Sequence, residues 1–127
     1  RLAERGVEVR VVNARFAKPL DCELIVASAA GRPVVMTAED HTHVGGFGEA
    51  VLACLAAAGA LPARFVQAAL PDAFLEHGTR DEILESVGLH PEGLVERFLA
   101  AATGSGANLD DGADVGRIHT STESGVR

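Results

Sequence analysis

The sequence predicts an α/β fold, a three-layer sandwich in which helices cover both faces of a mostly parallel sheet. Short apolar runs of strand length recur along the chain, segments with helical character separate them, and glycine or proline stands at most of the boundaries. Alternation of strand and helix favours parallel pairing, because a parallel strand needs a crossover connection. The 127 residues suffice for one domain with a real core.

The first elements lie before residue 31. Arg1–Gly6 has the form of a helix end closed by glycine, and Val7–Val12 is apolar enough for a buried parallel strand. Asn13–Leu20 is expected to be a loop, after which Asp21 can cap a helix that runs to about Ala30. Because a domain rarely begins inside a helix, we expect the first strand of the sheet to precede Arg1 and to be missing from this chain.

The middle of the chain contains two further short apolar runs. Pro33–Ala38 and Ala63–Ala69 are predicted to be strands, and a helix is expected between them from about Phe47 to Ala58. Glu39–Val44 joins the earlier strand to this helix and is expected to be a polar loop.

The last third is predicted to be helical and then to lose its structure. Thr79 begins a capping-box pattern, so a helix is expected from there to about Val87. His90 precedes Pro91 at the start of a last helix, which is expected to end near Ala102. Thr103–Arg127 is rich in Gly, Ser, Asp and Thr and is predicted to be a flexible tail after a domain of residues 1–102.

Charge and composition exclude several classes of function. The net charge is −7 and no basic cluster occurs, which argues against a nucleic-acid surface. No apolar run reaches the length that a membrane span requires. Cys22 and Cys54 have no close spacing and no activating base nearby in sequence, so they are expected to be buried or half-buried free thiols, without a nucleophilic role, in a cytoplasmic protein.

Two segments between strand and helix suggest ligand chemistry. Gly45–Gly48 opens a helix, where backbone N–H groups could hold a phosphate, although the segment matches neither a dinucleotide fingerprint nor a P-loop. A tight turn that brings the helix close to the sheet is favoured instead. His41 and His43 share a face of an extended segment, but a zinc site normally needs a third protein ligand, so a polar loop is favoured and no metal site is predicted.

Three other side chains deserve consideration as single candidates. Arg15 follows an expected strand, and its planar fork suits a phosphate or a carboxylate, although a surface or ion-paired arginine fits the pattern as well. Lys18 is held before a proline, and His77 lies in a turn-rich segment without a partner that the sequence can identify. The residues alone therefore indicate an anion-binding arginine and no self-sufficient active site.

Several blocks, in the correct order from Leu2 to Ala102, resemble one enzyme family. Val11–Asp21 reads VVNARFAKPLD, and it is followed by Glu39-Asp40-His41 with Gly45–Gly48 and by Leu70–Gly78, which reads LPDAFLEHG. They resemble the C-terminal domain of 1-deoxy-D-xylulose-5-phosphate synthases, within the wider group of transketolase C-terminal domains. The Arg-Phe-x-Lys-Pro-Leu-Asp form resembles the synthases specifically.

The resemblance implies a part of a homodimeric transferase. Such synthases condense pyruvate with glyceraldehyde 3-phosphate and release carbon dioxide, and the product feeds isoprenoid, thiamine and pyridoxal biosynthesis. Thiamine diphosphate and Mg²⁺ supply the chemistry and are bound by N-terminal domains that are not in this chain. The resemblance implies that Arg15 binds the phosphate of glyceraldehyde 3-phosphate, and that the 127 residues alone have no turnover.

Two alternatives stay open at this point. The chain could belong to a transketolase or to the beta subunit of a 2-oxoacid dehydrogenase. It could also be a stand-alone, non-catalytic module for binding or dimerisation.

Overall fold

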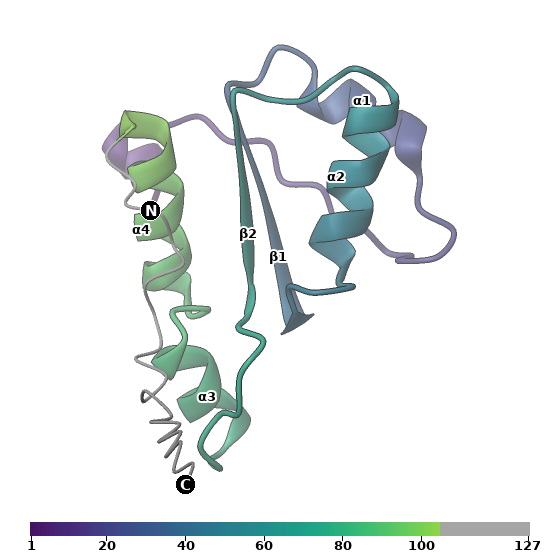
Figure 1. The fold of residues 1–127 in the computed structure, drawn as a ribbon. Helices are drawn as coiled ribbons and strands as arrows, with labels where there is room; N and C mark the ends of the chain where they lie inside the picture. The colour runs from purple at the N-terminus through teal and green to yellow at the C-terminus, as the bar shows by residue number, and fades with distance from the viewer. Residues whose placement is uncertain (105–127) are drawn as a thin grey trace, which may run out of the picture.

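The computed structural model describes residues 1–104, and Figure 1 shows their arrangement. The elements follow in the order η1 (Ala3–Arg5), α1 (Cys22–Ala29), β1 (Val34–Thr42), α2 (Phe47–Ala57), β2 (Arg64–Leu70), α3 (Arg80–Ser86) and α4 (Pro91–Thr103). Strand and helix alternate through β2, as the sequence predicts. Among the described residues no helix has the length and apolar character that crossing a bilayer demands.

The strands β1 and β2 form a parallel pair. Val34 pairs with Arg64, and the register continues without a break to Ala38 opposite Ala68. The next pair is Thr42 with Leu70, so β1 spends four residues where β2 spends two. The sequence-based prediction of a polar loop at Glu39–Val44 is therefore partly wrong. Its first four residues extend β1 through this irregularity, which turns polar side chains out at the end of the strand.

Helices cover both faces of this pair, which gives the layered α/β arrangement that the sequence predicts (Figure 1). On one face α1 and α2 enclose a core of Ala29, Val51 and Leu55, the last fully buried. Val35 and Phe65 pack against this core from the two strands. On the opposite face α4 contacts both strands. The described part of the sheet contains two strands, which is fewer than the sequence predicts.

The prediction of a strand at Val7–Val12 is wrong for this structure. No strand is formed there, and residues 8–12 make no backbone hydrogen bond to any described residue. The local sequence favours extended backbone, but a strand exists only where a neighbour completes its hydrogen bonds. No described residue forms a ladder with this segment, and Val9, Val11 and Val12 are exposed.

The helix boundaries agree with the sequence to within a residue or two, because short-range capping determines them. The Asp21 carboxylate accepts the N–H of Leu24 at 3.0 Å at the start of α1. Thr79 and Glu82 form the complete capping box that begins α3. Pro91 is the first residue of α4, and His90 occupies the N-cap position without a side-chain hydrogen bond to the helix.

The end of the last helix falls one residue later than expected. α4 includes Thr103 and is closed by Gly104, which has a left-handed φ of 73°. The rest of the predicted tail, from residue 105 to Arg127, lies outside the described residues.

Candidate functional site

Glu39 organises the start of α2, at the carboxyl end of β1. Its Oε2 accepts the N–H of Phe47 at 2.5 Å, and its Oε1 accepts the N–H of Gly48 at 2.7 Å. These are donors of the first helical turn, which otherwise lack a partner and carry the positive end of the helix dipole. Glu49 adds a second carboxylate by accepting the N–H of Gly45 at 2.9 Å. The chain thus supplies its own anion where a phosphate could have bound.

The glycines of this turn are required by close approach, which confirms the tight turn that the sequence favours. A Cβ at Gly46 would lie 2.4 Å from the carbonyl oxygen of Thr42. A Cβ at Gly48 would lie 2.5 Å from Gln67 Nε2 and 2.7 Å from Thr37 Oγ1. Real side chains do not tolerate such distances, so these positions bring α2 down onto both strands and hold the Glu39 carboxylate against the helix.

The two histidines at the end of β1 do not form a metal centre with other described groups. His41 Nδ1 lies 3.0 Å from the carbonyl oxygen of Thr42, and His43 Nδ1 lies 3.3 Å from that of Leu70. The backbone N–H of His43 also donates to Leu70 at 3.0 Å, which ties β1 to β2. Within residues 1–104 no three His, Cys, Asp or Glu side chains gather closely enough to hold a metal ion.

An ion pair joins this end of the sheet to α3. Arg80 Nε donates to Asp40 Oδ2 at 2.7 Å, and both side chains are largely exposed. An exposed pair of this kind contributes about 0–1 kcal/mol to stability. It positions the start of α3 and leaves Asp40 paired.

Arg15 lies in the exposed loop before α1, as the sequence predicts. Its guanidinium carbon is 6.0 Å from the centre of the Phe16 ring, a distance at which the ring's negative face attracts the cation. The Phe16 side chain is itself 65% exposed. No described carboxylate forms an ion pair with Arg15, so its five N–H donors are available to a ligand.

The other single candidates are not assembled into a site by the described residues. Lys18 and His77 are exposed, and neither forms a hydrogen bond or ion pair to a described residue. Cys54 is buried, and burial, with a smaller effect from Cys22, raises the pKa of its thiol from 9.0 to about 11. Cys54 therefore stays protonated near neutral pH, in agreement with the unreactive thiol expected from the sequence. Cys22 is exposed, so the expectation that both thiols are at least half-buried is wrong for this residue.

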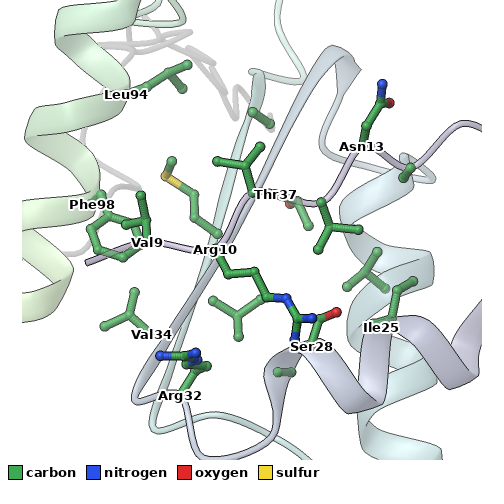
Figure 2. A pocket seen from close by; sticks show the side chains of 18 of the residues that line it. Val9, Arg10, Asn13, Ile25, Ser28, Arg32, Val34, Thr37, Leu94 and Phe98 are labelled. Atoms are coloured by element: carbon green, nitrogen blue, oxygen red, sulfur yellow. The ribbon is translucent and has the colours of Figure 1, made fainter. Parts of the chain in front are cut away.

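A cavity of about 670 Å³ lies between β1 and the segment of residues 8–14 (Figure 2). Its walls are mainly apolar, and Figure 2 shows Leu94 and Phe98 of α4 on one side and Ile25 of α1 on the other. Asn13 and Ala14 contribute to the wall but Arg15 does not. Arg15, which the sequence predicts to bind an anion, is therefore not a lining residue of this cavity.

The sequence does not predict two features of this region. Glu39 stands in the segment predicted to be a polar loop, although an acidic residue shortly before a glycine-rich helix start is a signal for such a contact. The cavity had no local signal, because it is formed by residues that are distant along the chain.

Comparison with known proteins agrees with the blocks of sequence described above. The family described as "Transketolase, C-terminal domain" matches residues 1–94. A 1-deoxy-D-xylulose-5-phosphate synthase 1 of Geobacter sulfurreducens is 41% identical over 103 residues, which is 79% of this chain and 16% of the relative. The synthase of Syntrophotalea carbinolica is 45% identical over 93 residues, 73% of this chain and 14% of the relative.

A third relative matches this chain with similar identity and coverage. The 1-deoxy-D-xylulose-5-phosphate synthase of Symbiobacterium thermophilum is 43% identical over 96 residues, which is 76% of this chain and 15% of that protein. The chain thus spans about one sixth of the length of the curated relatives that it matches.

Proposed function

Because the chain belongs to the transketolase C-terminal domain family, we propose that it is the C-terminal domain of a 1-deoxy-D-xylulose-5-phosphate synthase. The full-length protein would condense pyruvate with glyceraldehyde 3-phosphate and release carbon dioxide. The identity of 41–45% to proteins named as such synthases supports this reaction over that of a transketolase or a 2-oxoacid dehydrogenase.

The proposed task of this domain is to bind the phosphate of the acceptor aldehyde through Arg15. The observation that carries this role is an exposed guanidinium that lies 6.0 Å from the Phe16 ring and has no ion-pair partner among the described residues. A guanidinium can bind a phosphate through two parallel hydrogen bonds, which fixes the orientation of the ligand as well as its position. Holding the phosphate would place the aldehyde for attack and would favour a phosphorylated acceptor.

The residues described here do not fit a site for thiamine diphosphate and Mg²⁺. Residues 1–104 contain no group of side chains suited to a metal, and the start of α2, where a phosphate could have been held, is occupied by Glu39. The proposal therefore assigns the cofactor to other domains of the full-length protein, and it assigns no catalytic step to this chain. Two further properties of the full-length protein also stay predictions, namely that it forms a homodimer and that it lies in the cytoplasm.

The reaction is tested with the purified full-length protein, pyruvate and glyceraldehyde 3-phosphate. Carbon dioxide and 1-deoxy-D-xylulose 5-phosphate should form in equal amounts and only with thiamine diphosphate and Mg²⁺ present. Ketol transfer between sugar phosphates, or transfer to a lipoyl group, would indicate one of the two related enzymes instead. A full-length protein without any of these activities would support a binding module.

The role of Arg15 is tested in the same assay by Arg15→Ala. The KM for glyceraldehyde 3-phosphate should rise roughly 10- to 100-fold, because a hydrogen-bonded charge contributes about 1.5–3 kcal/mol. The KM for pyruvate should not change. An unchanged KM for glyceraldehyde 3-phosphate would remove the proposed contact.

A further inference from the structure

The two cysteines of the chain meet in the fold, although they stand 32 positions apart in the sequence. Cys22 is the first residue of α1, and Cys54 lies in the second half of α2. These helices pack against each other on one face of the sheet (Figure 1). The Cys54 thiol donates to the carbonyl oxygen of Cys22 at 3.8 Å, so its sulfur contacts the residue that carries the other thiol.

The two thiols are neighbours as well. Burial raises the pKa of the Cys54 thiol to about 11, and a hydrogen bond with the Cys22 thiol and the charge of that group add to the effect. Because Cys22 is exposed, its side chain can rotate about the Cα–Cβ bond toward Cys54. The sequence alone assigns neither thiol a nucleophilic role, because it does not show that the two are neighbours.

The difference in exposure gives the two thiols different roles. Cys22 is exposed, whereas Cys54 is only 9% exposed. A dissolved oxidant therefore reaches Cys22, while Cys54 is covered and stays protonated near neutral pH, so that it reacts slowly by itself. An exposed cysteine with a second cysteine beside it is the arrangement in which the first is oxidised and the second then resolves the product into a disulfide.

The charges around Cys22 favour a neutral oxidant. Asp21 and Glu23 precede and follow it, both are exposed, and the chain as a whole has a net charge of −7. Carboxylates repel an anionic oxidant and slow its approach. Hydrogen peroxide has no charge at neutral pH, so it is the class of oxidant that suits this position.

We propose that Cys22 and Cys54 form a reversible disulfide in the presence of hydrogen peroxide, and that Cys22 reacts first. The Cys22 thiolate attacks one peroxide oxygen, the O–O bond breaks and hydroxide leaves, so that Cys22 becomes a sulfenic acid. The Cys54 sulfur then attacks the Cys22 sulfur, the S–O bond breaks, and the departing hydroxide takes the Cys54 proton to form water. In sum, the thiol pair loses two electrons and two protons, and one peroxide is reduced to two waters.

The bond would connect the start of α1 covalently to α2. The loop that carries Arg15 leads directly into α1, so the bond would also fix one end of this loop on the helical layer. Thiol reductants reverse such a bond by exchange, which makes it a response to the redox state and not a permanent brace. The inference does not depend on the proposed reaction.

Peptide mapping of the full-length protein tests the inference. The folded protein is treated with hydrogen peroxide, its remaining thiols are blocked, and it is digested without reductant. A peptide pair joined through Cys22 and Cys54 should appear in the mass spectrum, be absent from untreated protein, and be lost after treatment with dithiothreitol. Oxidation of Cys22 to the sulfinic acid without the joined pair would overturn the proposal. So would a peroxide-treated protein in which both residues remain thiols.

Two variants test the order of the steps. In Cys54→Ala the sulfenic acid at Cys22 has no resolving thiol, so it should persist and be captured by the nucleophile dimedone. In Cys22→Ser the buried Cys54 should stay unlabelled at the same peroxide concentration. Equal labelling of Cys54 and Cys22 in the two variants would contradict the order. Because Cys54→Ala removes a buried sulfur and can loosen the core, the peptide map of the unmodified protein decides if this variant does not fold.

Discussion

Two stretches of this chain present groups suited to an anion, and they differ in whether the chain supplies the anion itself. At the start of α2, the N–H groups of Phe47 and Gly48 are taken by the Glu39 carboxylate. In the loop before α1, the Arg15 guanidinium lies 6.0 Å from the centre of the Phe16 ring and has no ion-pair partner among the described carboxylates. Donors alone therefore do not identify a binding site. What matters is whether the chain has already satisfied them.

Removing the internal anion is expected to have the largest effect on stability. Glu39→Ala leaves two donors of the first turn of α2 without their charged acceptor, which should destabilise the protein by about 2–3 kcal/mol. Urea denaturation measures this loss. Ala53→Ser, at an exposed position of α2, is a matched control that should change little.

The same variant also tests whether the Glu39 carboxylate occupies a site for an anion. With Glu39 removed, the start of α2 resembles an open anion site, so inorganic phosphate should stabilise Glu39→Ala more than the unmodified protein. Equal stabilisation of both proteins by phosphate would show that Glu39 does not fill the site of an anion.

A change in the turn itself should have a smaller effect. Gly48→Ala places a Cβ 2.5 Å from Gln67 Nε2 and 2.7 Å from Thr37 Oγ1, so these two side chains or α2 itself must shift. A loss of about 1–2 kcal/mol is expected, as for other overpacked positions, and the same denaturation experiment detects it. Unchanged stability would contradict a close approach of α2 to the strands at Gly48.

The smallest effect is expected at the capping box of α3. Hydrogen bonds from the backbone and side chain of Thr79 lower the pKa of Glu82 below its ordinary value of 4.5. A lowered pKa in the folded state means that this contribution to stability is full above pH 4.5 and is lost as the pH falls through the lowered value. Glu82→Gln should remove that part of the pH dependence, which acid titration of stability measures. If Glu82→Gln leaves the acid titration of stability unaltered, Glu82 does not contribute to the pH dependence of stability.

Much of the fold could be predicted from local signals. Asp21, Thr79 and Pro91 each mark the start of a helix through groups no more than a few residues away, and all three helices begin there. The apolar residues alone predict the runs that form β1 and β2, although β1 extends further than expected. Its extra residues are polar, and the irregular register that accommodates them depends on β2.

The remainder depends on partners that a local pattern does not contain. Val7–Val12 has the composition of a strand, but without a neighbour it forms no ladder in the described residues. Glu39 acts on a turn eight and nine residues further on, and only the folded chain shows that contact. For Arg15 the sequence indicated exposure in a loop, whereas its phosphate ligand stays a prediction.

The proposed contact between Arg15 and the phosphate of the substrate is tested by comparing two acceptors in the full-length protein. We would measure kcat/KM for glyceraldehyde 3-phosphate and for unphosphorylated glyceraldehyde, in the unmodified protein, in Arg15→Ala and in Lys18→Ala, which removes a nearby positive charge from the same exposed loop. The preference for the phosphorylated acceptor should fall roughly 10- to 100-fold in Arg15→Ala and stay nearly constant in Lys18→Ala. An unaltered preference in Arg15→Ala, or an equal fall in both variants, would contradict a direct contact between Arg15 and the phosphate.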